Sequence, residues 1–573
     1  MDGDWKFHWA QDPTARPVDF FKTDFDDAAW EEIPVPSNWN VVGIGKDGSQ
    51  KYGTPIYVNV NVPWLFKREP GDWRLGVMRT PPEDWTVYRT RNEVGSYRRR
   101  FEVPADWAGK RVLVDFEGVD SFFYLWVNGS YVGFSKNSRN LAQFDITALV
   151  RPGENVLAVE VYRFSDAGNL EVQDMFRLPG IFRTVALEAK PVVSVRDIRV
   201  TPSLQTLAVE AEVTGAAPGQ TLSYRLYEHP LYKDENELVA RFEGLSPSTV
   251  LSYPEAKPWS AEAPHRYTLV GELKDAAGAT LDVFSTIVGF REVAIRDTPA
   301  SEDEFGLAGR YFYLNGKPVK LRGVNRHETE PSMGHAITRE VMEEDVRLMK
   351  RANINHVRNS HYPDAPYWYW LCDKFGIYLM DEANIESHHY HYGEASLSHD
   401  PAWKDAHVAR MTEMVVSDYN HPSVLIWSMG NEAGPVENYS DRYTCAFVGK
   451  YSAPVSEQLG NYTKPQESGN HEQVRWASLT RSNGRGVRFD AVENSLRKSE
   501  SGYPVLSVSA LPYAATDLVP AMHAHELPAP GDTWLCLDAA VTGLGGNSCG
   551  PGPLPEDRVH SDATFAFLIR SVR

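Results

Sequence analysis

Between residues 310 and 434 the chain alternates short apolar strands with helices, and this alternation constrains the fold more than any other feature. Strands are predicted near YFYLNGKPVKLRGVNRHE, INHVRNSHYP, IYLMDEANIESH and HPSVLIWSMGNEAG, and helices near TREVMEEDVRLMKRANI, DAPYWYWLCDKFG and DPAWKDAHVARMTEMVVSDYN. Strands that are apolar throughout and alternate with helices are typical of a parallel sheet covered by those helices. Polar residues follow every strand, as they do at the C-terminal face of a TIM barrel.

The ends of these helices carry capping signals. Thr338 precedes the first helix as an N-cap, and Asp364 is predicted to open the second helix. Gly376 ends the second helix, because glycine suits a left-handed C-terminal cap. Asp400 is predicted as the N-cap of the third helix, with Pro401 at its first position.

The strand–helix alternation stops after Gly434. A TIM barrel needs about 250 residues, so the segment from 310 to 434 supplies about half of one. We therefore expect an incomplete barrel, in which strands one and four have open edges with unpaired backbone groups.

The remaining chain is predicted to be rich in β-structure. Residues 1–190 contain strand-like runs such as RVLVDFEGV and NVLAVEVYRF, and Asn128-Gly129 between two aromatic runs indicates a hairpin. These features predict a jelly-roll β-sandwich over 1–190, and a similar, smaller pattern predicts an immunoglobulin-like β-sandwich over 191–300. Residues 301–434 form the incomplete TIM barrel, and 435–573 are Gly/Pro-rich with short β-like runs.

Composition excludes several classes of partner. The 573 residues include 58 Lys+Arg and 77 Asp+Glu, for a net charge of −19, so a nucleic acid or an anionic membrane is not expected as a partner. Four scattered cysteines do not suit a disulfide framework or a cysteine-based zinc site. The sequence shows neither a secretory signal at its start nor a long apolar stretch, which favours a soluble, cytoplasmic protein. Aromatic residues make up 12%, which suits β-sheet cores and, as an alternative, stacking on sugars.

Chemistry-bearing residues gather after the four predicted strands. These groups are Asn325 to Glu328, Arg358 to His361, Asp381 to His388, and Asn431-Glu432. A single glutamate after a strand is more often a structural residue, but carboxylates and imidazoles after four successive strands suit acid/base work on a polyhydroxylated substrate.

These motifs resemble those of glycoside hydrolase family 2, and within it the large bacterial-type β-galactosidases. VNRHE, VRNSHYP, DEANIESH and HPSVLIWSMGNEAG resemble its barrel motifs, while VPSNWN, LWVNGSYVG and VQDMFRLPGIFR resemble its jelly-roll domain. GPVENYSDR, PQESGNH, SALPYAATDL and GPGPLPEDR resemble the end of its C-terminal β-supersandwich. The resemblance implies a retaining hydrolase that cleaves terminal β-galactosides such as lactose, and a family that forms homo-oligomers.

The resemblance also implies roles for individual residues. Glu432 matches the acid/base, and Asn431 matches a residue that hydrogen-bonds the sugar. Glu386, His388 and Glu432 match ligands of Mg²⁺; an ordinary hydrogen-bonded pair is the alternative for the first two. The matches to substrate-binding residues are His327 and His361 at galactose hydroxyls, Asp174 near the sugar and a possible Na⁺, and Asn59 in a loop that reaches the site.

The sequence also departs from the family pattern. No Glu-Tyr motif, which would carry the nucleophile, follows Glu432. The resemblance therefore implies that the second half of the barrel and the domain after it are absent, with a join at Gly434-Pro435, and that the N-terminal extension is absent. Cys549 stands where the family carries a tryptophan that stacks on the sugar.

Three hypotheses follow for function. The chain could be an active β-galactosidase that uses a substitute nucleophile; the available glutamates are Glu437, Glu457, Glu467 and Glu526. It could instead be a non-catalytic galactoside-binding or assembly protein, or a truncated gene product without a stable role. In each case we expect Glu432 at the mouth of the barrel, in a partly shielded pocket that raises its pKa.

Overall fold

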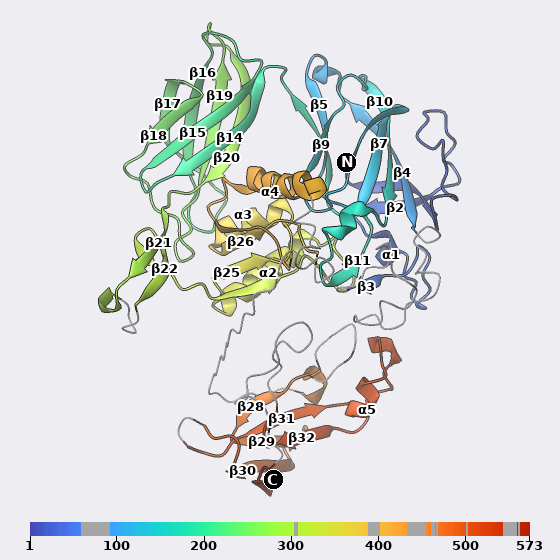
Figure 1. The fold of residues 1–573 in the computed structure, drawn as a ribbon, viewed down its shortest axis with the longest axis vertical. Helices are drawn as coiled ribbons and strands as arrows, with labels where there is room; N and C mark the ends of the chain where they lie inside the picture. The colour runs from blue at the N-terminus through green and yellow to red at the C-terminus, as the bar shows by residue number, and fades with distance from the viewer. Residues whose placement is uncertain are drawn as a thin grey trace. The chain divides into compact units, whose positions relative to one another are not determined.

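The computed structural model describes residues 1–58, 92–302, 308–387, 401–432, 454–459, 465, 468–499, 502–541, 559 and 562–572. The chain divides into two compact units, Met1–Pro435 and Val436–Arg573. Figure 1 shows the ribbon of the chain, with its strands and helices labelled.

The first 190 residues form a jelly-roll sandwich, as expected. Its large antiparallel sheet has the order β2-β1-β4-β10-β7-β8, with strands β1 Gly3–Ala10, β2 Glu31–Val35, β4 Val94–Val103, β7 Phe122–Val127, β8 Ser130–Ser135 and β10 Gly153–Tyr162. The second sheet, β13-β5-β9, contains β5 Arg111–Phe116, β9 Ala142–Asp145 and β13 Val185–Lys190. Two short pairs, β3 Ile56–Val58 with β11 Met175–Arg177 and β6 Val119–Asp120 with β12 Gly180–Ile181, and the helix α1 Trp39–Val42 complete the domain.

Apolar side chains from the two jelly-roll sheets pack into one core. Fully buried members include Trp5 of β1, Leu125 of β7, Leu157 of β10 and Val114 of β5. The predicted hairpin is confirmed: Asn128 and Gly129 join β7 to β8 with φ of 49° and 82°. Positive φ at both positions is the conformation for which an Asn-Gly pair is suited.

An immunoglobulin-like sandwich follows, also as expected. One sheet, β14-β15-β18, contains β14 Ser194–Pro202, β15 Thr206–Thr214 and β18 Ser248–Ser252. The other, β17-β16-β19-β20, contains β16 Thr221–Glu228, β17 Glu237–Leu245, β19 Tyr267–Lys274 and β20 Thr280–Val288. A further antiparallel sheet, β21-β22-β23, leads into the next domain with β21 Val293–Thr298, β22 Gly309–Leu314 and β23 Lys317–Pro318.

The predicted parallel sheet is present and has the order β24-β25-β26-β27. Its strands are β24 Gly323–Arg326, β25 His356–Asn359, β26 Tyr378–Glu382 and β27 Val424–Ser428, and its helices are α2 Arg339–Arg351, α3 Pro366–Phe375 and α4 Lys404–Asp418. Buried residues of α2 and α3 pack against the strands, with Val346 and Trp368 in one core with Val357 and Leu379. All strand pairs are parallel, so the residues after each strand lie along one edge of the sheet.

The helix ends confirm two expectations and correct two. Thr338 directly precedes α2, and Gly376 ends α3 in the left-handed conformation with φ of 69°. Asp364 does not open α3, because Ala365 occupies the N-cap and the Asp364 carboxylate instead accepts a bond from Arg326 at 2.8 Å. Pro401 begins a 3₁₀ turn rather than α4, and Asp400 lies outside the described residues.

The barrel is incomplete in the part of the chain that the structure describes. No described strand pairs with the outer edge of β24 or β27. The central strands β25 and β26 are mostly buried, whereas three of the four residues of β24 are exposed. This agrees with the expected half barrel.

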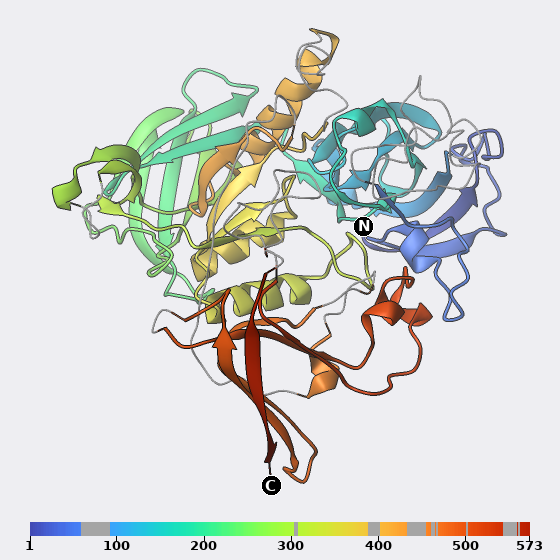
Figure 2. The same cartoon turned by 60° about the horizontal axis from the view of Figure 1, so that its bottom comes forward.

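The second unit contains two antiparallel sheets. The sheet β28-β31-β32 contains β28 His471–Val474, β31 Leu506–Leu511 and β32 Trp534–Asp538. The sheet β29-β30-β33 contains β29 Trp476–Thr480, β30 Gly486–Asn494 and β33 Phe565–Val572, and a short helix, α5 Ala515–Leu518, follows β31. The antiparallel pairing of β30 with β33 is visible near the C-terminus (Figure 2).

Candidate active site

The last residue of β26, Glu382, is the centre of a polar network at the carboxyl edge of the parallel sheet. Arg358 of β25 donates Nε to Oε2 at 2.7 Å and Nη2 to Oε1 at 2.8 Å, and His361 Nδ1 lies 2.8 Å from Oε1. Ser428 of β27 donates its hydroxyl to Oε2 at 2.6 Å. Burial by itself would raise the pKa of Glu382, but the hydrogen bonds from His361 and Arg358 outweigh burial and hold the pKa below its usual value.

The same arginine connects this network to the fourth strand end. Arg358 Nη2 also donates to Oδ1 of Asn431 at 3.0 Å, and the Asn431 backbone N–H donates to the carbonyl of Ile385 at 2.9 Å. Gly430 has φ of 136°, and a Cβ at this position would lie 2.6 Å from the Ile385 carbonyl oxygen. Glycine therefore allows the close backbone approach that places Asn431, and Glu432 after it, beside the third strand end.

The jelly roll contributes a segment to the site. The Glu386 N–H donates to the Leu170 carbonyl at 2.7 Å, and the Val172 N–H donates to the Glu386 carbonyl at 3.0 Å. Residue 386 thus forms one parallel bridge with Glu171 and another with Asn431. Glu386 is 1% exposed, so these backbone contacts with the jelly roll and the fourth strand end accompany a buried side chain.

The two predicted sugar-binding histidines are neighbours. The rings of His327 and His361 have centroids 5.4 Å apart in an edge-to-face arrangement, and His327 Nδ1 lies 3.4 Å from the Tyr362 hydroxyl. Burial, together with the nearby His361 and Arg139, lowers the pKa of His327 to about 4. A neutral imidazole can both donate and accept, which suits a sugar hydroxyl.

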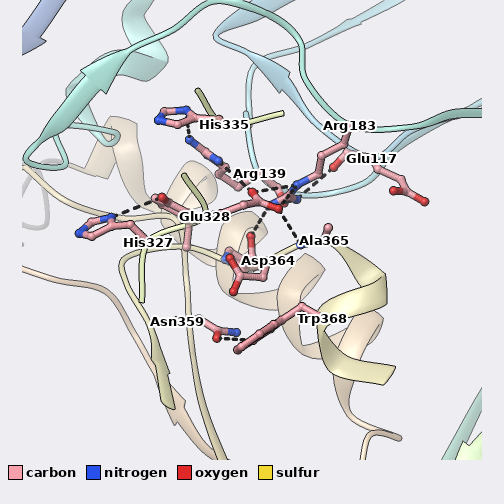
Figure 3. Close-up of polar contacts among 12 residues, drawn as sticks. Glu117, Arg139, Arg183, His327, Glu328, His335, Asn359, Asp364, Ala365 and Trp368 are labelled. Carbon is pink, nitrogen blue, oxygen red and sulfur yellow. Dashed lines mark hydrogen bonds and ion pairs between the residues drawn. The ribbon is translucent and has the colours of Figure 1, made fainter. Parts of the chain in front are cut away.

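Glu328, the residue after His327, is buried under the site (Figure 3). Its carboxylate accepts from Arg183 Nη2 at 2.6 Å and from Arg139 Nη1 at 3.1 Å, both of which belong to the jelly roll. It also accepts the backbone N–H of Ala365 at 3.2 Å, and Arg139 Nη2 lies 2.7 Å from His335 Nδ1. This Glu328 cluster, formed by Glu328, Arg139 and Arg183, joins the two domains directly beneath His327.

The other predicted residues differ in exposure and location, and some lie outside the described residues. Glu432 has φ of 41° and is exposed, so the described residues do not form the expected shielded pocket around it. Asp174 is half-buried in the jelly-roll segment that follows Glu171. Of the suggested substitute nucleophiles, Glu526 is exposed and accepts the Met522 N–H at 2.7 Å, and Glu457 lies in a short 3₁₀ turn, both in the second unit. Five predicted positions lie outside the described residues: Asn59, His388, Glu437, Glu467 and Cys549.

Sequence reasoning grouped Arg358, Glu382 and Glu328 with the polar clusters but gave them no role. Arg139 and Ser428 were not identified. The available signal was a charged residue inside an otherwise buried strand, as with Arg358 and Glu382, because such a residue is normally paired.

Two of the residues expected to hold Mg²⁺ carry oxygen donors, which suit a hard cation. Glu386 and Glu432 supply carboxylate oxygens, and the bridge between residues 386 and 431 brings their backbones together. Among the described residues, no group of three His, Cys, Asp or Glu side chains is arranged to hold a metal ion. The third expected ligand, His388, is outside them.

Family comparisons match most of the chain. Residues 1–191 match the sugar-binding domain of glycosyl hydrolases family 2, residues 193–291 match a further family 2 domain, and residues 305–454 match the family's TIM barrel domain. The chain belongs to glycosyl hydrolase family 2. Residues 432–569 match the β-galactosidase small chain, so the two last matches overlap just after the fourth barrel strand.

Relatives of this family 2 chain include two named β-galactosidases. That of Priestia megaterium is 39% identical over 467 residues, which cover 78% of this chain and 42% of the relative. That of Vibrio vulnificus is 38% identical over 476 residues, which cover 80% of this chain and 42% of the relative. The chain therefore spans less than half the length of the curated relatives that it matches.

Solved structures support the fold of the family 2 domains. A β-glucuronidase from Ruminococcus gnavus aligns with a TM-score of 0.58 and 23% identity. The alignment covers 77% of this chain and 67% of the β-glucuronidase chain. One from Faecalibacterium prausnitzii aligns with a TM-score of 0.55 and 24% identity, covering 75% and 67%. Separately, none of the helices in the described ranges has both the length and the apolar character needed to span a bilayer.

Proposed function

We propose that this chain binds terminal β-galactosides at the carboxyl edge of its parallel sheet, as a β-galactosidase-type glycoside hydrolase whose own turnover is near background. The observation that carries the proposal is the network in which Glu382 orients Arg358 and His361 while Arg358 holds Asn431. Fixed donors and acceptors on three neighbouring strand ends suit a ligand that presents several hydroxyl groups. The names of the relatives favour galactosides as the class.

Impaired turnover follows from the carboxylates that are present. A retaining hydrolase uses two carboxyl groups about 5–5.5 Å apart, one as acid/base and one as nucleophile. Glu432 supplies the acid/base, but no Glu-Tyr motif follows it. Glu382 does not replace the nucleophile, because Arg358, His361 and Ser428 already engage both of its oxygens.

Metal binding remains part of the proposal. Glu386, Glu432 and His388 would hold Mg²⁺, and Asp174 would lie near a Na⁺. When bound, a divalent ion would supply positive charge next to the sugar. Arg358, His361 and Asn431 would orient the sugar hydroxyls independently of that ion.

Two assays on the full chain test the proposal. Calorimetry with galactose should show binding, and Arg358→Met should abolish it because the variant loses its bonds to both Glu382 and Asn431. Arg347→Met is the matched control, since Arg347 is an exposed arginine of α2 paired with Glu344. Hydrolysis of an aryl β-galactoside should stay at background.

Two results would contradict the proposal. Absence of galactose binding, or equal binding by the Arg358 variant, would remove the sugar site. Rapid hydrolysis that is lost in Glu432→Gln would show that a nucleophile is present after all and that the chain is an active enzyme. Galactose binding with hydrolysis at background is the result that the proposal predicts.

A further inference from the structure

A cavity lies away from the carboxyl edge of the parallel sheet. It has a volume of about 360 Å³ and is lined by residues of β14, of the β21–β22 hairpin and of the segments next to them: Pro202, Arg291, Glu292, Val293, Ala294, Arg296, Tyr313 and Gly316. One of these residues, Arg291, contacts the carbonyl of Val424, where β27 begins. The candidate sugar site follows the opposite end of β27, so the cavity is a separate place in the fold.

Arg291 is a half-buried cation whose hydrogen-bond partners are neutral. Its Nη1 donates to the Pro422 carbonyl and its Nη2 donates to the Val424 carbonyl at 2.7 Å. It forms no ion pair with any carboxylate in the described ranges. Burial lowers the pKa of Arg291 to about 10, and the charge of the Asp373 carboxylate offsets only part of that effect. Because this guanidinium donates to carbonyl groups and not to a carboxylate, a bound anion would offset part of its loss of solvent.

Arg296 provides a second guanidinium in the same cavity. It is exposed and stacks over the Tyr313 ring at 5.1 Å, again without an ion pair to a described carboxylate. The neighbouring Arg310 differs, since its Nε lies 2.8 Å from Asp297. One acidic residue, Glu292, also lines the cavity, so its charged lining comprises two cations and one anion.

We propose that this arginine pocket, defined by Arg291, Arg296 and Tyr313, binds a small phosphate-bearing anion. Guanidinium groups match the oxygens of phosphate with paired N–H donors, and neither guanidinium here forms an ion pair with a carboxylate in the described ranges. The cavity falls within the usual size range of small-molecule sites and is larger than a bare phosphate needs. The occupant is therefore either free phosphate or a phosphorylated monosaccharide, which share the chemistry that the arginines recognise.

Calorimetry on the full chain at constant ionic strength tests this inference. Inorganic phosphate should bind saturably, and Arg296→Ala should weaken binding by about tenfold because it removes a charge-assisted contact. Glu292→Gln should tighten binding by about threefold by removing a repelling charge. Arg310→Ala is the matched control and should change the affinity by less than about twofold, since Arg310 is already paired with Asp297.

Comparison of ligands separates the two sources. A hexose 6-phosphate that binds more tightly than phosphate assigns the pocket to a phosphorylated sugar, and equal affinities assign it to phosphate alone; both support the inference. A neutral hexose should not compete for this pocket. The inference is overturned if phosphate shows no saturable binding, or if Arg310→Ala weakens binding as much as Arg296→Ala. Neither result bears on galactose binding at the carboxyl edge.

Discussion

The jelly roll and the parallel sheet bury their strands to very different degrees. In the jelly roll, β10 has partners on both sides and seven consecutive buried residues. In the parallel sheet, β25 and β26 are buried in the same way, but β24 is largely exposed and β27 has one buried residue. Burial of these strands thus follows from having neighbours on both sides. The candidate sugar site includes residues that follow the two central strands, β25 and β26, and the two edge strands, β24 and β27.

The largest expected effect concerns the contact between these two regions. Replacing Glu328 by alanine should lower the free energy of unfolding by about 3–5 kcal/mol, because Arg139 and Arg183 would remain buried without a counterion. Urea denaturation followed by tryptophan fluorescence measures this loss. Glu344→Ala removes an exposed partner of Arg347 and should cost less than about 0.5 kcal/mol. Equal losses for the two variants would show that the Glu328 cluster does not hold the domains together.

A matched pair of valines tests the comparison directly. Val159 of β10 is 0% exposed, and Val324 of β24 is 37% exposed. Replacement by alanine should lower the free energy of unfolding by about 2 kcal/mol at Val159 and by less than about 0.5 kcal/mol at Val324. The same denaturation measurement applies to both. A large loss at Val324 would mean that the outer face of β24 is covered in solution.

Much of the fold could be predicted from the sequence because the signals are local. Alternation of apolar residues, the Asn128-Gly129 turn and the Gly376 cap each depend on a few neighbouring residues, and each is confirmed. The start of α3 could not be predicted in this way. Asp364 has the chemistry of an N-cap, but a long-range bond to Arg326 takes its carboxylate. Such tertiary competition is not encoded in local spacing.

The candidate site was predicted as a set of strand ends but not as a network. Parallel strands bring His327, His361 and Asn431 to one edge, which the alternation of strands and helices already implies. The pairing of Arg358 with both Glu382 and Asn431 depends on side-chain directions on three strands. The jelly-roll bridge to Glu386 joins residues more than 200 positions apart, and no sequence pattern indicates it.

Two adjacent residues of β26 should respond to pH with opposite signs. Asp381 points to the helices, where Tyr369 donates its hydroxyl at 2.7 Å, and Glu382 points to the site, because successive strand residues face opposite sides. Burial raises the pKa of Asp381 to about 6 and also raises that of its neighbour Asp418, whereas the pKa of Glu382 is lowered. Asp381 therefore keeps its proton in the native state below about pH 6, and its contribution to stability falls as pH rises from about 4 to 6.

Asp381→Asn separates these contributions. Asparagine resembles the neutral acid. Between pH 4 and pH 6 the free energy of unfolding of the variant should therefore fall by about 1–2 kcal/mol less than that of the parent. Glu382→Gln should remove a contribution to stability of the opposite sign. That contribution is present above the ordinary pKa of glutamate, and it is lost as pH falls through the lowered pKa of Glu382. Urea titrations at both pH values measure the two differences. The same pH slope in the parent and Asp381→Asn would contradict the assignment of a raised pKa to Asp381.

The last expected effect is at His327, on the border between the two regions. Because burial lowers its pKa to about 4, the imidazole should stay neutral throughout the range in which an ordinary histidine, with a pKa near 6.5, gains a proton. Its contribution to stability is complete above about pH 6.5 and is lost as pH falls towards 4, which is opposite in sign to that of Asp381. NMR of the ring carbons, assigned by comparison with His327→Gln, should show no titration between pH 8 and about pH 5.5, while a short peptide containing this histidine titrates normally. An ordinary titration of His327 in the folded chain would mean that water reaches the ring, and that the contact between the jelly roll and the parallel sheet is looser than the Glu328 cluster implies.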